Sequence, residues 1–177
     1  MREYFLKTGR IGFSKWTKED AAFACSLWGD REVARFICST SKFSKQDVQK
    51  RLALEIENSV RFHVQYWPIF SLEDGEFLGC CGLRPHDMEK GVYELGFHLK
   101  QEHWGKGYAT EAAGAVINYA FDVLGVDNLV AGHHPPKHRF SKGSFEAGLS
   151  QNRRCLLPSH RASSCRLSLP SARLTNK

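Results

Sequence analysis

The sequence predicts an α/β domain in which helices flank a β-sheet, and three observations support this prediction. An apolar segment at residues 92–99 leads through Gly105 and Gly107 into a helical pattern at 108–124, which is the order strand, glycine turn, helix. Strand-like segments and helical patterns also alternate before this stretch. The chain has 177 residues, 42% of them hydrophobic, which suits one domain with a core of its own.

The first elements are predicted to be a strand and three helices. Residues 10–16 alternate apolar and polar side chains, which is typical of a strand. Thr17 followed by Asp20 resembles a capping box and begins a short helix, and residues 31–38 predict a second one. Ser44 caps a longer helix. The apolar residues of that helix recur at spacing four: Val48, Leu52 and Ile56.

The next segments predict a hairpin and two further strands. Residues 64–72 are strand-like, and Pro68 indicates an edge position or a bulge. A turn at 73–75 returns the chain through a second strand at 76–83, after which residues 84–87 are expected to leave the sheet. One more strand is predicted before the glycine turn, at residues 92–99, and another after the helix that follows the turn, at residues 128–132.

The glycine turn indicates an anion site. Without side chains at Gly105 and Gly107, backbone N–H groups can approach a phosphate closely, and the positive end of the following helix points at the same place. Gly-x-Gly alone is a weak signal, because most such pairs are ordinary turns. No Gly-Lys-Ser/Thr follows, which excludes a P-loop, and no third glycine has the dinucleotide-fold spacing. The helix itself faces a core with residues at spacing four: Tyr108, Ala112, Val116, Ala120 and Leu124.

The segment EHWGKGYATEA at residues 102–112 resembles the acetyl-coenzyme A signature of GNAT-type N-acetyltransferases. The likeness is strongest to the branch that includes the ribosomal-protein N-terminal acetyltransferases, and it covers residues 5–135. It implies a mixed, mostly antiparallel sheet flanked by helices, with the first helices beside the acceptor. It also implies acetyl transfer from acetyl-coenzyme A to a primary amine, either a protein N-terminus or a small molecule.

The resemblance implies roles for individual residues. In the family the pantetheine arm of the cofactor lies between two diverging strands, here 92–99 and 129–132. Glu94 is the first candidate for the general base, although strand alternation could equally turn it to solvent, and His134 is the second. The cofactor-binding residues implied are Phe97, His98, Leu99, Trp104, Gly105, Lys106, Gly107, Tyr108, Ala109 and Thr110.

The chain departs from the family pattern after residue 134. The family's Glu-Asn-x-x-Ser and Lys-Leu-Gly-Phe are missing, and a one-nucleotide shift of the codons for 135–154 would restore similar residues in order. We therefore expect an acetyltransferase domain at 1–134 and a basic tail rich in Ser, Arg and Pro at 135–177, with a frame-shifted origin. The last predicted strand would then have an exposed edge. The alternative function is a remnant that binds coenzyme A weakly or not at all and does not catalyse transfer.

Composition excludes several other classes. No apolar run approaches the roughly 20 residues of a membrane helix, and residues 1–10 lack a signal-peptide core, so we expect a cytoplasmic protein without a membrane partner. The formal net charge is +6, but the positive excess lies in residues 135–177, which lack interleaved aromatic residues, so nucleic acid is not an expected partner. A homodimer through the exposed last strand is an open alternative. The six cysteines show no metal-binding spacing, so we expect reduced thiols and no metal: Cys25, Cys38, Cys80, Cys81, Cys155 and Cys165.

Overall fold

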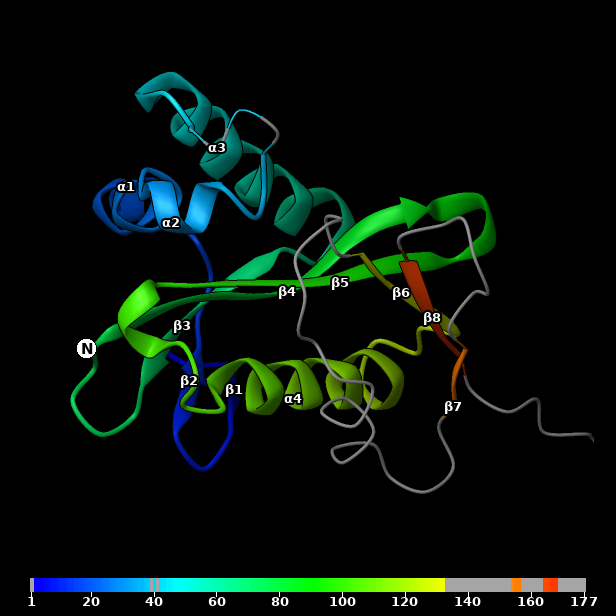
Figure 1. Cartoon of the computed structure of the whole chain (residues 1–177). Helices are drawn as coiled ribbons and strands as arrows, with labels where there is room; N and C mark the ends of the chain where they lie inside the picture. Colours follow the sequence, from blue (N-terminus) through cyan, green and yellow to red (C-terminus); the bar gives the residue numbers. More distant parts are fainter. Residues whose placement is uncertain (1, 39, 41, 133–153, 157–163, 169–177) are drawn as a thin grey trace, which may run out of the picture.

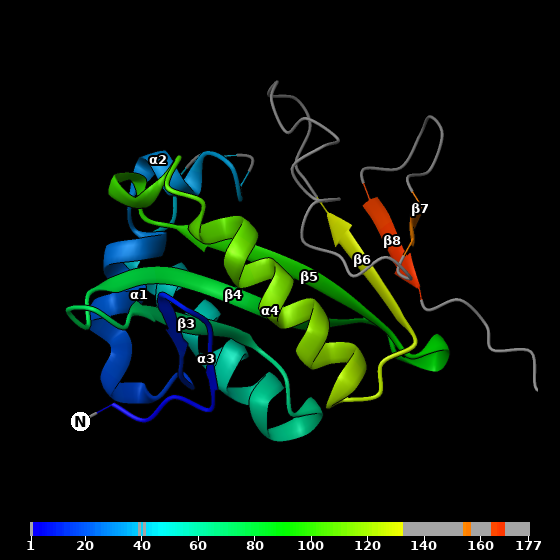
Figure 2. The same cartoon turned by 90° about the horizontal axis from the view of Figure 1, so that it is seen from below.

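A twisted sheet separates two helical layers in the computed structural model, which describes residues 2–38, 40, 42–132, 154–156 and 164–168. Helices α1 (Ala21–Trp28), α2 (Arg31–Ala34) and α3 (Lys45–Phe62) cover one face, and α4 (Tyr108–Asp122) covers the other (Figure 1). Seen from the side of α4, this helix runs along β4 and β5 (Figure 2). The α/β fold class predicted from the sequence is therefore confirmed.

Among the described residues, eight strands form one sheet in the order β1-β2-β3-β4-β5-β6-β8-β7. Neighbouring strands are antiparallel except for β5 and β6, which are parallel. This agrees with the expected mixed, mostly antiparallel sheet. The strands are β1 (Leu6–Lys7), β2 (Ile11–Phe13), β3 (Tyr66–Ser71), β4 (Phe77–Asp87), β5 (Val92–Leu99), β6 (Asn128–Gly132), β7 (Arg154–Leu156) and β8 (Ser164–Ser168). Three short 3₁₀ helices complete the described elements: η1 (Lys18–Asp20), η2 (Met88–Lys90) and η3 (Gln101–His103).

Local signals explain several element boundaries. Ser44 caps α3, because its hydroxyl accepts from the N–H of Asp47 while the Asp47 carboxylate accepts from the N–H of Ser44. The α3 helix ends at Phe62, and the next residue, His63, adopts a left-handed conformation with φ of 59°. The hairpin predicted around residues 73–75 joins β3 to β4, and a register shift between Ile69 and Phe70 follows Pro68.

Four expectations differ from the structure. Residues 84–87 stay in β4, because Arg84 pairs with Glu94 of β5 and a register shift between Pro85 and Asp87 accommodates the strand end. The first strand is shorter than 10–16, and a separate β1 precedes it; likewise α2 ends at Ala34 instead of residue 38. The edge of β6, expected to be exposed, pairs with β8 from the tail. The argument for dimerisation through that edge therefore no longer applies.

Each face of the sheet carries its own buried cluster. On the α4 face, Leu83, Leu95 and Leu129 pack with apolar residues of α4 such as Val116 and Ile117. On the opposite face, α1 and α3 pack against the aromatic side chains of β3 and β4 and against Cys80. Because successive strand residues point to opposite faces, Tyr93, Leu95, Phe97 and Leu99 of β5 join the α4 cluster. The residues between them face α1 and α3.

Candidate active site

The two glycines of the loop between η3 and α4 both need a left-handed backbone. Gly105 has φ of 75° and Gly107 has φ of 82°, a region that other residues rarely adopt. A Cβ at Gly105 would meet no atom within 4 Å, so the backbone angle, and not crowding, makes glycine the suitable residue. Residues 105–107 are exposed. The loop therefore leaves its backbone open to a ligand.

The backbone N–H groups at the start of α4 are available as donors. The first backbone hydrogen bond of this turn runs from Glu111 N to Gly107 O, at 3.1 Å. Within the described part of the chain, the N–H groups of residues 105–110 donate to no other residue. These groups and the positive end of a helix of 15 residues coincide, which favours a phosphate or diphosphate group here. The predicted loop geometry fits that ligand.

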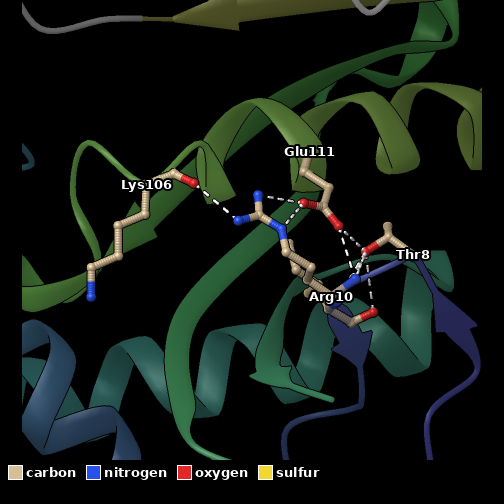
Figure 3. A network of polar contacts seen from close by, with 5 residues as sticks. Thr8, Arg10, Lys106 and Glu111 are labelled. Carbon is tan, nitrogen blue, oxygen red and sulfur yellow. Dashed lines mark hydrogen bonds and ion pairs between the residues drawn. The ribbon is translucent and has the colours of Figure 1, made fainter. Parts of the chain in front are cut away.

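An arginine from the β1–β2 turn fixes the loop in place (Figure 3). Arg10 Nη1 donates to the carbonyl oxygen of Lys106 at 3.1 Å, and the guanidinium carbon lies 4.6 Å from the Tyr108 ring centroid. The same side chain pairs with Glu111, with Nε 2.7 Å and Nη2 2.6 Å from Oε2. Because Arg10 holds the Lys106 carbonyl, it helps to set the orientation of the neighbouring peptide groups of the loop.

Glu111 is the acceptor at the centre of this network. Its Oε1 accepts from the Thr8 hydroxyl at 2.6 Å and from Arg10 N at 3.1 Å. Burial works to raise the pKa of Glu111, but the hydrogen bonds from Thr8 and Arg10 outweigh it, so the pKa lies below its usual value. Neither Thr8 nor Arg10 was singled out from the sequence. Glu111 was part of the motif, but no local pattern indicates its partners about 100 residues earlier.

Trp104 connects the loop to the end of β5. Its indole Nε1 donates to the carbonyl oxygen of Leu99 at 2.8 Å, so this one backbone group of the predicted cofactor strand is already used. The ring is 36% exposed and meets Phe36 edge-on, with centroids 5.6 Å apart. Trp104 therefore lies between the loop and the region after α2. Tyr108 packs edge-on against His103, and Ala109 and Thr110 lie in the first turn of α4.

The strand β5 runs past the point where its pairing with β6 ends. The parallel register stops at Leu95 opposite Ala131, whereas β5 continues to Leu99 and remains paired with β4. Beyond Leu95, only Gly132 of β6 remains among the described residues of that strand. The side chains of Phe97 and Leu99 pack toward α4. His134, the second candidate for proton transfer, lies outside the described residues.

Glu94 is half-buried on the face of α1 and α3. It is registered with Arg84 of β4 and Val130 of β6. Burial, and next the Glu94 carboxylate, raise the pKa of Tyr66, which places these two groups near each other. The Tyr66 hydroxyl lies against Gly96, where a Cβ would collide with it. Tyr66 was not singled out from the sequence, since one aromatic residue in an apolar strand carries no functional signal.

His98 shares this face with Glu94, and its side chain is surrounded by other residues. Its Nδ1 accepts from Trp28 Nε1 at 3.3 Å and lies 3.4 Å from Cys80 Sγ, while the ring stacks obliquely on Tyr66. Burial, Arg51 and Arg84 together lower the pKa of His98 well below 6.5. Its imidazole is therefore neutral at pH 7. The side chain takes part in packing, and only its backbone remains a candidate for binding the cofactor arm.

Neither neighbouring cysteine has the environment of a nucleophile. Cys80 and Cys81 are fully buried thiols, and burial raises the pKa of Cys80 to about 12. Both are small side chains of the two buried clusters, Cys81 on the α4 face and Cys80 on the opposite face. Among the described residues, Glu76, Glu102 and His103 form a group with ligand atoms within 4.8 Å of one another that could hold a metal ion. The Lys100 ammonium already contacts the Glu102 carboxylate there.

No described helix is both long and apolar enough to span a bilayer. Residues 10–142 match a family model described as an acetyltransferase (GNAT) domain. The chain is 31% identical over 130 residues to the uncharacterized N-acetyltransferase p20 of Bacillus licheniformis, and these residues make up 73% of each protein. It is 41% identical over 106 residues to the uncharacterized protein YkkB of Bacillus subtilis, and these residues make up 59% of this chain and 60% of that protein.

Solved structures share the fold at low sequence identity. An acetyltransferase of the GNAT family from Bacillus anthracis superposes with a TM-score of 0.67 at 18% identity, covering 92% of this chain and 94% of the other. A ribosomal L7/L12 alpha-N-protein acetyltransferase in complex with coenzyme A gives a TM-score of 0.65 at 11% identity, covering 94% and 96%.

Proposed function

The chain belongs to the GNAT acetyltransferase family and is an N-acetyltransferase, and from that premise we propose that it transfers an acetyl group from acetyl-coenzyme A to a primary amine. The observation that carries this proposal is the row of N–H groups at residues 105–110, which donate to no other described residue at the start of α4. A diphosphate is the anion that this row suits, because several amides and the helix dipole converge on it.

The proposed cofactor position follows the loop and the end of β5. The amides of Gly105 to Thr110 would hold the diphosphate, and the backbone of residues 97–99 would run beside the pantetheine arm as an added strand does. The end of the β5–β6 pairing at Leu95, four residues before β5 ends, supports this position. Arg10 would keep the loop in its binding conformation through Lys106. When bound, acetyl-coenzyme A supplies the thioester that is attacked.

The proposed chemistry needs a neutral amine and an acceptor for its proton. The amine nitrogen attacks the thioester carbonyl carbon, the carbon–sulfur bond breaks, the amine proton leaves to a base, and the thiolate takes up a proton. We propose Glu94 as the base, directly or through water, because it is half-buried on the face of α1 and α3, two residues before Gly96. His134 remains a second candidate for carrying the proton.

The acceptor we propose first is a protein N-terminal amine, with a small-molecule amine next. Support comes from the likeness of residues 102–112 to the ribosomal-protein N-terminal acetyltransferases. A neighbour in fold is titled a putative ribosomal-protein-serine acetyltransferase from Vibrio cholerae, with a TM-score of 0.67 at 17% identity. An inactive remnant is not favoured, because the family match spans residues 10–142 and the loop is intact in its geometry.

We also propose that residues 1–134 form the acetyltransferase domain and that 135–177 are an atypical tail read from a shifted frame. The departure from the family pattern after His134 supports this boundary. A variant gene in which one base restores the frame should encode a protein with higher affinity for acetyl-coenzyme A. Unchanged affinity in that variant would contradict the idea that the tail impairs the domain.

Thermal unfolding with and without acetyl-coenzyme A tests cofactor binding. A ligand that binds only the folded state stabilises it by about 2.7 kcal/mol at a concentration of 100 times Kd, so the melting temperature should rise. Acetyl-pantetheine, which lacks the diphosphate, should shift it far less. Thiol release with a panel of primary amines then measures transfer. No shift at millimolar acetyl-coenzyme A would contradict binding, and a shift without thiol release from any amine would contradict transfer.

A further inference from the structure

Two guanidinium groups and one buried carboxylate lie together on the face of the sheet that α1 and α3 cover. Arg84 of β4 contacts Glu55 of α3, and its guanidinium carbon lies 4.2 Å from the Tyr66 ring centroid. Arg51, one turn before Glu55 on α3, places its guanidinium carbon 5.0 Å from the Trp28 ring centroid and 5.8 Å from that of Phe43. The group therefore combines two positive charges with a single carboxylate on α3.

Both oxygens of that carboxylate are already in use. Glu55 has 0% exposure; its Oε1 contacts Arg84, and its Oε2 accepts from Tyr66 N at 2.8 Å. The Arg51 side chain makes no hydrogen bond or ion pair with any residue that the structure describes, and its buried Nε has no acceptor there. The side chain is half-buried, so part of it is open to a ligand. Burial and the charge of Arg84 lower the pKa of Arg51, and they outweigh the opposite effect of the Glu55 carboxylate.

The cation lies on the side of the sheet where the proposed acceptor amine would approach. Arg51 and Arg84 both act on the pKa of His98, which places them near β5. His98, Gly96 and Glu94 alternate along β5 toward this same face, away from the α4 cluster. Trp28 joins the two regions, because its Nε1 donates to His98 and its ring contacts Arg51. Arg51 and Glu94 therefore lie on the same face of the sheet, joined through the contacts of Trp28 and His98.

We propose that the acceptor amine also carries an anionic group, a carboxylate or a phosphate, and that Arg51 binds it. The inference rests on the proposed acetyl transfer and names the class of its acceptor. Arginine suits this role because its planar group donates in pairs to carboxylate and phosphate oxygens. The Trp28 ring lies 5.0 Å from the guanidinium carbon, and the charge of Arg84 is close enough to act on the pKa of Arg51. The anion could belong to a free amino acid or to an acidic residue of a peptide.

Matched pairs of amines test this specificity. Wild-type kcat/KM should be higher for glycine than for glycinamide, or higher for a peptide with aspartate near its N-terminus than for the same peptide with asparagine. The first pair reports a free amino acid and the second a peptide. Arg51→Met should reduce kcat/KM for the anionic member about tenfold to a hundredfold, the range for a lost charge-assisted hydrogen bond, and leave the neutral member within about threefold. Arg51→Lys should retain part of the preference.

Arg61→Met is the control on the same helix, because Arg61 is exposed and pairs with Glu57 at 2.9 Å. Arg61→Met should leave kcat/KM unchanged for both the anionic and the neutral amine of each matched pair. Equal kcat/KM of the wild type for charged and neutral amines would overturn the inference and leave the proposed acetyl transfer standing.

A binding measurement tests whether Arg51 binds an anion without requiring turnover. Coenzyme A at a saturating concentration first occupies the loop. Inorganic phosphate should then give the wild type and Arg61→Met a higher melting temperature than chloride does at equal ionic strength. Arg51→Met should show no such rise. A similar rise in Arg51→Met would overturn the inference, whatever the amine panel shows.

Discussion

Two arginine–glutamate pairs join a helix to the sheet, and they differ in burial and in their neighbours. Glu55 of α3 has a fully buried side chain, and that of its partner Arg84 is 19% exposed. Glu111 of α4 and its partner Arg10 have side chains that are 23% and 50% exposed. The first pair lies between α3 and β4, inside the face that holds the proposed acceptor site. The second lies at the surface, beside the glycine loop.

The difference shows that the same two residue types serve distinct purposes. Removing one member of a buried pair leaves a charge with neither water nor a partner, so stability depends strongly on the pair being complete. An exposed pair gains little net energy, because water and salt compete with it. What Arg10 and Glu111 provide is geometry, since Arg10 also holds the Lys106 carbonyl. We therefore expect the buried pair to affect folding and the exposed pair to affect binding.

The largest expected effect comes from Glu55→Gln. Glutamine keeps the shape of the side chain but removes the negative charge that pairs with Arg84 and acts on the pKa of Arg51. The free energy of unfolding should fall by about 3–5 kcal/mol, measured by urea unfolding at pH 7.5.

Glu57→Gln is the matched control on the same helix, because Glu57 has a 55% exposed side chain and pairs with Arg61 on the surface. That change should cost about 0.5 kcal/mol or less. If Glu55→Gln and Glu57→Gln lowered stability equally, the contrast between a buried and an exposed pair would be wrong.

A smaller effect should follow from lowering the pH, through His98. Burial, Arg51 and Arg84 lower its pKa in the folded protein well below 6.5, whereas the unfolded chain takes up a proton near that value. As the pH falls, the unfolded state therefore binds more protons than the folded state. The contribution of His98 to the free energy of unfolding is fully present above about pH 6.5. Below that pH it falls by up to about 1.4 kcal/mol per pH unit. Urea unfolding at pH 7.5, 6.5 and 5.5 measures this loss.

His98→Asn should remove most of this dependence, while His86→Asn, at an exposed position of β4, should keep it. The exposed pair behaves differently. The pKa of Glu111 is lowered from 4.5, so its contribution persists at pH 5.5 and is lost only as the pH falls through its folded value. If the free energy of unfolding of His98→Asn fell between pH 6.5 and 5.5 as much as that of the wild type, His98 would not be the cause of the loss of stability.

Local patterns predicted the elements that position the site. The bounds of β5 agree with the expected residues 92–99, and Ser44 begins α3 as its capping pattern indicated. Gly105 and Gly107 adopt the left-handed conformations expected of a glycine loop. These features depend on side-chain periodicity or on single backbone angles, which the sequence displays directly.

Partners far apart along the chain could not be predicted in the same way. Arg10 contacts residues of the loop and α4 about 100 positions later, and no spacing rule connects them. Residues 84–87 were expected to leave the sheet, yet cross-strand pairing between Arg84 and Glu94 keeps them in β4. The pairing of β8 with β6 is also long-range. The core patterns were local, whereas the ionic contacts depend on the tertiary arrangement.

The smallest effect on folding is expected from Arg10→Met. Its side chain is 50% exposed, so the free energy of unfolding should fall by only about 0.2–1 kcal/mol. A double-mutant cycle with Glu111→Gln should give a coupling energy in that range at low salt, which shrinks in 1 M NaCl because the screening length there is about 3 Å. The coupling energy from a double-mutant cycle on Arg84 and Glu55 should change little with salt, because that pair is shielded from solvent.

The same substitution should nonetheless weaken acetyl-coenzyme A binding about tenfold, on the order of 1.4 kcal/mol, because the loop loses the contact that fixes Lys106. Titration of wild type, Arg10→Met and Glu111→Gln with acetyl-coenzyme A measures this. Arg61→Met serves again as a control for the loss of one surface charge. Unchanged affinity in Arg10→Met would mean that the loop keeps its conformation without the arginine, and the functional half of the contrast between the two pairs would then fail.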